Sequence, residues 1–327
     1  MNTSSAIGTD VLRLDPAKEV ARVSDSIRDT VFGHLKRKGA VVGVSGGIDS
    51  AVVAYLCARA LGPNRVTILL MPERDSSPDS LRLGKMVAEA LHIQPVVEDI
   101  RGILEASGCY RRRDDSIREV VADFREGDLC KISLPNVVDA DHYSIFSLIV
   151  QSREGRIRKV RLTAAASMGI VAATNFKQRI RKMMEYYHAD RSQYAVAGTP
   201  NRLEHDLGFF VKNGDGAADF KPIAHLYKCQ VYQLAAYLGV PAEIQSRVPT
   251  TDTYSLEQTQ EEFYFAVPLH KMDMCVYGKD AGIAAGELSA LVGLEPAQVE
   301  RVYALIETRR RATRYLHMAP MLVESPL

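Results

Sequence analysis

The sequence predicts an α/β fold, a doubly wound parallel sheet with a partly β insertion and C-terminal helices. Two observations favour this class. In the first hundred residues, short apolar runs alternate with helical patterns in the order strand, helix, strand, helix, strand. The runs are also continuous, as at 40–44, which is typical of strands buried on both faces in a parallel sheet.

The elements of this unit follow in chain order. Residues 17–38 place apolar side chains at three- and four-residue spacings with charges between them, which predicts an amphipathic helix. The other predicted elements are a strand at 40–44, a helix at 51–61, a strand at 66–71, a polar loop at 72–80, a helix at 81–91 and a strand near 95–100.

The regularity breaks between Gly102 and Leu162, which we interpret as an insertion. Short runs at 130–134, 143–151 and 157–162 predict strands, with a hairpin turn at 152–155. Beyond it we expect a helix from about 174 to 189, a strand at 193–197, and helices near 228–239, 257–272, 286–292 and 296–312. The predicted organisation is 1–101 for the first part of the main domain, 102–162 for the insertion and 163–327 for the remainder.

Composition narrows the class of protein. The 327 residues carry 41 basic and 40 acidic side chains, and a net charge of +1 disfavours nucleic acid as the main partner. No stretch approaches the ~18 apolar residues of a membrane span, and no signal-peptide pattern precedes residue 17. Five scattered cysteines favour reduced thiols over a disulfide framework or a zinc site. We therefore expect a cytoplasmic protein that binds neither membrane nor nucleic acid.

The segment from Ser45 to Ser50 carries the clearest chemistry. Gly46 and Gly47 let the backbone turn tightly and bring its N–H groups against an anion. The helix that follows adds unpaired N–H groups and the positive end of its dipole, so a phosphate or pyrophosphate is stabilised there. Ser45 and Ser50 add hydroxyl donors, and Asp49 can hold a divalent cation against the same phosphates. A turn with no ligand is the alternative, and the full string after a buried strand favours function.

This string, SGGxDS after an apolar strand, resembles the PP-loop of the N-type ATP-pyrophosphatases, whose fold is adenine nucleotide α-hydrolase-like. That superfamily includes NAD synthetase, GMP synthetase, asparagine synthetase, argininosuccinate synthetase and tRNA-modifying enzymes. The loop alone does not indicate which of these enzymes the sequence resembles most.

Later strings resemble ammonia-dependent NAD synthetase in order and spacing. The stretch from Met71 to Ser80 is similar to that family's loop at the ATP pocket. Residues 175–181 are similar to its NxQARxR helix, which helps to bind the dinucleotide substrate at a dimer interface; a solvated basic face is the alternative. Residues 198–204 are similar to its GTSNKxE string, in which Thr199 would contact the nucleotide and Glu204 would bind magnesium. For Glu204, the alternative is an ordinary carboxylate at a helix start.

Three further strings extend the resemblance. Residues 208–219 are close to the family's GxFTKxGDGxAD, which would put Lys212 and Asp215 near the pyridine end of the substrate. Lys228 lies in a PLxxLxKxxV-like string and can neutralise phosphate as a mobile point charge. Thr250, in a PTADL-like string, would place a hydroxyl on the phosphate side. The basic segment 309–317 resembles a tail that closes the active site, or it is simply a basic helix end.

The resemblance implies a set of site residues. Asp49, Lys228 and Asp215 would be catalytic, and Asp49 and Glu204 would bind Mg²⁺. Asn175, Arg179, Lys212 and Asp215 would bind the substrate. ATP, the co-substrate, would be bound by Gly43, Ser45, Gly46, Gly47, Asp49, Ser50, Met71, Thr199, Lys228 and Thr250.

The implied reaction converts deamido-NAD to NAD. The nicotinate carboxylate attacks the α-phosphorus of ATP, pyrophosphate leaves, and ammonia displaces AMP from the acyl-adenylate. Only about forty residues precede Ser45, too few for a glutaminase domain, so we expect free ammonia or a separate glutaminase, and a homodimer as in the family.

Some features depart from the family pattern, among them Pro200, Gly84-Lys85, the interruption at 265–268 and the size of the insertion. They leave open a related amide ligase that acts on another carboxylate. A tRNA-thiolating enzyme and a nucleotide-binding module without catalysis are more distant alternatives. The first predicts a basic domain or paired cysteines, neither of which is seen, and the presence of Asp49 and Glu204 disfavours the second.

Overall fold

A four-stranded parallel sheet lies at the centre of the computed structural model, which describes residues 9–133, 146–251, 253–265 and 267–324. The strand order is β3-β2-β1-β7, with Ala40 of β1 opposite both Val66 of β2 and Ala195 of β7. The strands are β1 (Ala40–Gly43), β2 (Val66–Leu70), β3 (Val96–Val97) and β7 (Ala195–Val196). The predicted α/β class with a parallel sheet is confirmed, although β3 and β7 are shorter than predicted.

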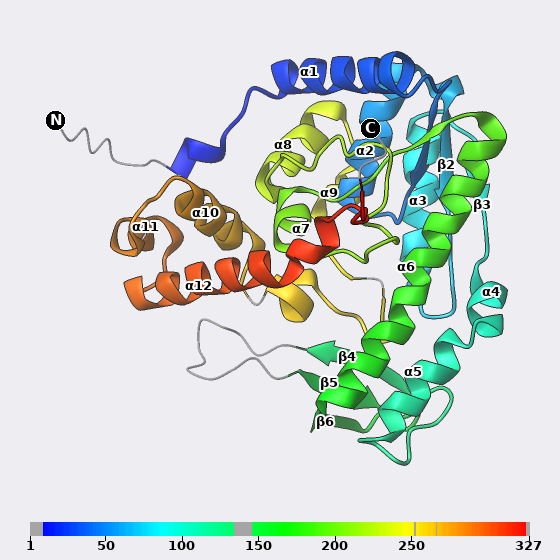
Figure 1. Ribbon diagram of the computed structural model, residues 1–327, viewed down its shortest axis with the longest axis vertical. Coiled ribbons are helices and arrows are strands. Elements are labelled where there is room, and N and C mark those ends of the chain that lie inside the picture. The colour runs from blue at the N-terminus through cyan, green and yellow to red at the C-terminus, as the bar shows by residue number, and fades with distance from the viewer. Residues whose placement is uncertain (1–8, 134–145, 252, 266, 325–327) are drawn as a thin grey trace.

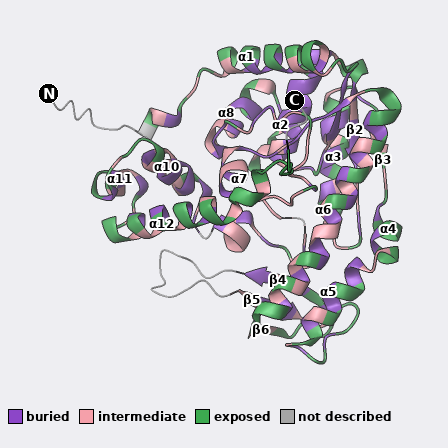
Figure 2. Ribbon diagram, viewed as in Figure 1, coloured by how far each residue is buried: buried purple, intermediate pink, exposed green. Residues whose placement is uncertain are grey.

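Alternate residues of the strands point to opposite faces of the sheet, and helices cover both faces. Val42 and Ile68 pack with helices α1, α2, α3 and α8 on one face. Val41 and Leu69 pack with Ala189 of helix α6 on the other. This two-sided burial is the reason that the strands have continuous apolar sequences. Figure 2 shows buried residues concentrated in α2 and near β2.

The helices of the first hundred residues are close to the prediction. They are α1 (Pro16–Arg28), continued by a π-helical turn η2 (Asp29–His34), then α2 (Ile48–Leu61), a short η3 (Pro63–Arg65) and α3 (Pro78–Ala90). The first helix ends before residue 38, because Lys36 adopts a left-handed backbone conformation with φ of 52°. Helix α2 begins three residues earlier than predicted, so that Asp49 and Ser50 lie in its first turn.

Residues 102–162 contain both helices and strands. Two short helices, α4 (Arg101–Ala106) and α5 (Cys109–Arg118), were not predicted. Strands β4 (Leu129–Ser133), β5 (Ser147–Gln151) and β6 (Ile157–Arg161) form an antiparallel sheet, and the turn at 152–155 joins β5 to β6 as predicted. The predicted strand residues 134 and 143–145 lie outside the described residues. The limits of the insertion stay a prediction.

Helix α6 (Ala164–Ser192) has 29 residues and begins ten residues before the predicted start. Thr163 caps its N-terminus by accepting a hydrogen bond from the Ala166 N–H at 3.1 Å. Figure 1 shows α6 running from the antiparallel sheet to the parallel sheet, so this one helix joins the two parts of the molecule.

The C-terminal third is mainly helical. It comprises α7 (Arg202–Leu207), α8 (Lys228–Leu238), α9 (Ala242–Ser246), a π-helical turn η4 (Glu261–Phe265), α10 (Leu269–Asp280), α11 (Ala285–Val292), α12 (Pro296–Thr313) and η5 (Arg314–His317). From the N-terminal end of the chain, Leu12 of the turn η1 (Thr9–Leu12) packs into the core of these helices. The predicted helix at 257–272 is wrong. Pro268 disfavours helical backbone at the residue before it and lacks an N–H, and it precedes the first residue of α10. Among the described residues, no helix is long and apolar enough to cross a membrane.

Candidate active site

The loop between β1 and α2 lies at the carboxyl end of the sheet and leads directly into the N-terminus of α2. Gly47 precedes the first turn of α2, and no side chain caps that end of the helix by a hydrogen bond. Ser50 Oγ donates to the Gly47 carbonyl at 3.0 Å, which holds the loop in a tight turn. Gly46 has φ of 78°, and a Cβ there would lie 2.8 Å from the Ser80 carbonyl oxygen of α3. The residue must therefore be glycine, and the loop leaves an anion-binding helix N-terminus open.

A cavity of about 480 Å³ lies above this loop. Of the predicted site residues, only Gly46 does not line it, because Gly46 packs against α3 instead. The predicted residues that line the cavity are Gly43, Ser45, Gly47, Asp49, Ser50, Met71, Asn175, Arg179, Thr199, Glu204, Lys212, Asp215, Lys228 and Thr250. Segments far apart in the sequence thus meet at the carboxyl edge of the sheet, as expected for a doubly wound fold.

Two carboxylates and a lysine meet at one side of the cavity. Lys228, at the start of α8, forms an ion pair with Asp49 Oδ2, and Asn201 Nδ2 donates to Asp49 Oδ1 at 3.0 Å. Burial works to lower the pKa of Lys228, but the charges of Asp49 and Glu204 outweigh it and leave that pKa above its ordinary value. Lys228 is thus held as a cation next to the predicted pyrophosphate loop.

Glu204 lies beside this pair in the first turn of α7. Its carboxylate accepts from the Asn201 N–H at 3.1 Å and from Gln260 Nε2 at 3.0 Å. Burial, and then the charge of Asp49, raise the pKa of Glu204 above its ordinary value. The two carboxylates therefore repel each other, which a cation between them would relieve. The described residues contain no group of three or more His, Cys, Asp or Glu that could hold a metal on its own.

Asp273 of α10 positions Lys228, and the sequence analysis missed it. This side chain has no exposed surface and accepts from the Lys228 N–H at 3.0 Å and the Cys229 N–H at 2.7 Å. It caps the N-terminus of α8 from a different helix, so no local sequence signal identifies it. Burial raises its pKa to about 6.

The opposite side of the cavity is formed by α6, the loop 208–219 and the C-terminal segment. Arg179 Nε donates to the Lys212 carbonyl at 3.3 Å, and Asp215 accepts from the Val211 N–H at 2.8 Å. Lys212 Nζ donates to the carbonyl of Tyr315 at 2.9 Å, and Tyr315 itself lines the cavity. Tyr315 and Leu316 thus form part of the cavity wall, and closure of the active site by residues 309–317 stays a prediction.

A buried ionic network, also missed by the sequence analysis, connects two loops of the site. Lys177 of α6 is fully buried and its Nζ donates to Glu73 at 2.8 Å, Asp75 at 2.7 Å and the Thr253 carbonyl at 2.7 Å. Arg113 of α5 donates to Asp75 at 2.6 Å. The network fixes the loop after β2 and the loop that carries Thr250 to the same point of α6, and it joins both to the predicted insertion.

Comparisons with known proteins identify the family of this chain. A sequence model of the family described as NAD synthase matches residues 19–131 and 146–313. A protein of Mesorhizobium japonicum named NH(3)-dependent NAD(+) synthetase is 57% identical over 95% of this chain and 98% of its own. One of the same name from Rhizobium meliloti is 55% identical over 96% of this chain and 94% of its own.

Solved structures share the fold. An NH3-dependent NAD synthetase from Campylobacter jejuni superposes with a TM-score of 0.61 at 23% identity, over 95% of this chain and 100% of that one. An NMN synthetase from Francisella tularensis gives 0.64 at 21% identity, over 94% and 98%. At these identities the structures support the fold, and the sequence relatives support the family.

Proposed function

Because this chain belongs to the NAD synthase family, we propose that it is a C–N ligase that converts deamido-NAD to NAD with ATP and ammonia. The reaction passes through an acyl-adenylate and releases AMP and pyrophosphate. The observation that carries the proposal is that one cavity contains both the open N-terminus of α2 with the Asp49–Lys228 pair and, opposite, Asn175 and Lys212.

In the first step, the nicotinate carboxylate attacks the α-phosphorus of ATP and the bond to pyrophosphate breaks. The N–H groups of the Ser45–Ser50 loop and the dipole of α2 stabilise the negative charge that develops on the leaving pyrophosphate. Lys228 adds a cation that Asp273 holds in place through the backbone of α8. Thr199 and Thr250, which line the same cavity, offer hydroxyl donors to the phosphates.

Mg²⁺ fits the donor set of Asp49 and Glu204. Magnesium in nucleotide sites is commonly held by one or two carboxylates, water and substrate phosphates, so a closed protein cage is not required. Burial and the charge of Asp49 raise the pKa of Glu204, and a bound dication would offset the repulsion between the two carboxylates. When bound, Mg²⁺ would neutralise phosphate charge.

In the second step, ammonia attacks the acyl carbon, AMP leaves, and the nitrogen loses a proton. Exchange of a carboxylate oxygen for AMP supplies the leaving group, so no covalent enzyme nucleophile is needed. Asp215 and Lys212 stay our candidates for the pyridine end of the substrate. Arg179 supports them, since its side chain donates to the backbone of Lys212.

The test is incubation with ATP, Mg²⁺, ammonium and deamido-NAD, followed by quantification of AMP, pyrophosphate and NAD. Equal amounts of all three products support the proposal. AMP without NAD, together with turnover on another carboxylic acid, would assign the chain to the alternative, an amide ligase for a different substrate. ADP and inorganic phosphate would refute adenylation itself.

We also propose that the protein is a cytoplasmic homodimer whose ammonia is free or comes from a separate glutaminase. Large hydrophobic side chains, Met183 at 52% and Tyr187 at 54% exposed, lie one turn apart on α6 and support a partner surface there. Light scattering on wild type and on Met183→Glu tests the dimer, and a monomeric wild type would refute it. Glutamine in place of ammonium should give no NAD with this chain alone.

A further inference from the structure

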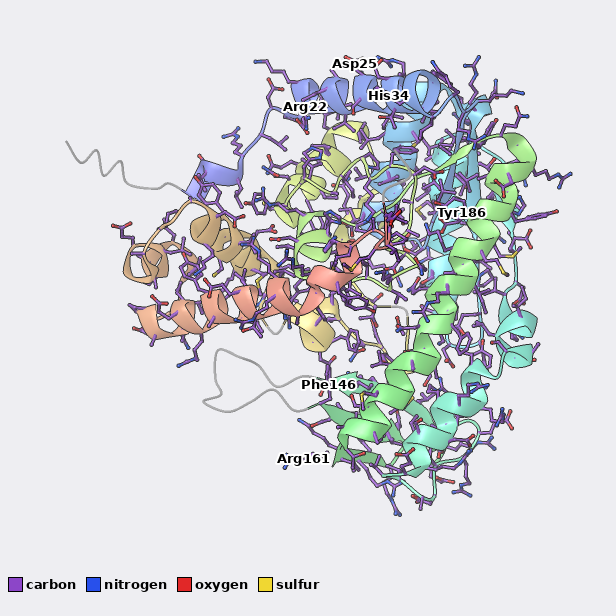
Figure 3. All side chains as sticks on the ribbon, viewed as in Figure 1. Arg22, Asp25, His34, Phe146, Arg161 and Tyr186 are labelled. Atoms are coloured by element: carbon purple, nitrogen blue, oxygen red, sulfur yellow. The ribbon has the colours of Figure 1, made fainter. Side chains whose placement is uncertain are left out.

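A buried ion pair on α6 lines the cavity and has no role in the chemistry above. Lys182 and Glu185 lie one turn apart, 5% and 7% exposed, and Lys182 Nζ donates to Glu185 Oε2 at 2.5 Å. Tyr186, the next residue and labelled in Figure 3, donates to Asp219 at 3.3 Å, which fixes this turn of α6 to the end of the loop 208–219.

The second oxygen of Glu185 reaches the end of strand β1. A Cβ built on Gly43 would lie 2.6 Å from Glu185 Oε1 and 3.2 Å from Met71 Cε. The carboxylate can approach the strand only because Gly43 has no side chain. Among the described residues, Lys182 is the donor to this carboxylate, and it bonds to Oε2, which leaves Oε1 without a donor from the protein. Oε1 is not among the enclosed side-chain oxygens that lack a partner, so it is open to the cavity, where a ligand can donate to it.

The surroundings of Oε1 suit a purine. Val44, Leu70 and Met71 are apolar residues that line the cavity at the carboxyl ends of β1 and β2. With the phosphates at the Ser45–Ser50 loop, as the proposed function has it, the base of ATP would extend over these strand ends. A carboxylate in such a position discriminates between bases, because adenine carries an amino donor at its 6-position and 6-oxopurines carry an acceptor there.

We propose that Glu185 is a specificity-determining residue that accepts a hydrogen bond from the 6-amino group of ATP. This inference rests on the proposed function, which places ATP in this cavity. Lys182 supports this role of Glu185. Its ammonium neutralises the buried carboxylate and occupies Oε2, so that Oε1 alone faces the base.

The decisive measurement is kcat/KM for ATP, for purine riboside triphosphate, which lacks the amino group, and for inosine triphosphate. In the wild type, we expect loss of the amino group to lower kcat/KM about tenfold or more, as for a hydrogen bond to a charged partner. If purine riboside triphosphate is used as well as ATP, the inference is overturned without any variant.

The variant Glu185→Gln tests whether this side chain sets the preference for the base. Lys182 requires an acceptor, so the amide oxygen should replace Oε2 and the amide NH₂ should replace Oε1. The variant should therefore lose its preference for ATP over purine riboside triphosphate and gain on inosine triphosphate by about tenfold relative to ATP. An unchanged ratio would show that the ion pair is structural only.

The control is Glu98→Gln. Glu98 pairs with His188 of the same helix at 2.8 Å but does not line the cavity. Its base preference should equal that of the wild type. Because each result is a ratio within one variant, partial loss of folded protein does not affect it. Failure of the wild type to release AMP from ATP would refute the proposed function, whereas turnover without base discrimination would refute only this inference.

Discussion

Replacement of Lys177 by Met tests whether the buried network holds the site together. Lys177→Met keeps the apolar stem and removes the ammonium, which leaves Glu73, Asp75 and the Thr253 carbonyl without their shared donor. Asp75 retains Arg113, but the fully buried Glu73 loses its cation. Removal of one partner from a buried pair typically costs about 3–5 kcal/mol of stability, and we expect a loss in that range.

The measurement is urea unfolding at pH 7 followed by far-ultraviolet circular dichroism, since the chain has no tryptophan. Arg82→Met is the matched control. Arg82 also pairs with two carboxylates, Asp79 at 2.9 Å and Glu243 at 2.6 Å, but all three are about half exposed. The control should lose no more than about 1 kcal/mol. A loss below that value for Lys177→Met would refute the reasoning.

The difference in unfolding free energy between Lys177→Met and the wild type should also depend on pH. Burial works to raise the pKa of Asp75, but Lys177 and Arg113 outweigh it and leave that pKa below its ordinary value. In the wild type, this stabilisation is present above the ordinary pKa of 3.8 and is lost as the pH falls further. Without Lys177, Asp75 takes up a proton at higher pH. The gap in unfolding free energy between variant and wild type should therefore narrow from pH 7 towards pH 4.

Three further substitutions test the site. Asp49→Asn removes the charge beside Lys228 and should lower kcat, measured as AMP release, by about 100-fold or more; a near-normal rate would contradict the assigned role. Gly46→Ala places a methyl group 2.8 Å from a backbone oxygen at φ of 78° and should cost at least about 2 kcal/mol in urea unfolding and weaken ATP binding. Gly155→Ala, at φ of 82° with open space, is the control and should cost about 1 kcal/mol. Lys212→Met removes the donor to the Tyr315 carbonyl, so trypsin should cleave the C-terminal segment faster, as followed by mass spectrometry, and an unchanged rate would contradict the contact.

The parts of the fold that were predicted correctly have local causes. The continuous apolar run of β1 reflects burial on both faces, and the Gly-Gly string after it fixes the turn into α2. The start of α6 was missed because 164–173 is rich in small residues and lacks a clear apolar stripe. Helix α5 was missed because its sequence is mostly charged, and its buried Arg113 is stabilised by Asp75, which is distant in sequence.

The candidate site also contains residues that could be predicted from the sequence and residues that could not. Residues in strings at strand ends, such as Thr199 and Glu204, could be placed from the sequence, since the carboxyl ends of parallel strands share one edge. Their supporting partners could not. Asp273 contacts the helix of Lys228 from 45 residues away, and Lys177 reaches Glu73 across 104. Such contacts depend on how helices pack, which no single segment encodes.

The position of the C-terminal segment has a practical consequence for work with this protein. Figure 1 shows the red end of the chain turning inward from α12, and Tyr315 and Leu316 form part of the cavity wall. An affinity tag fused at that end would extend a segment that borders the cavity, whereas residues 9–12 do not line the cavity. Purification through the other terminus is therefore the safer design for kinetic measurements. Crystals grown from a C-terminally tagged protein should be checked for a displaced Tyr315.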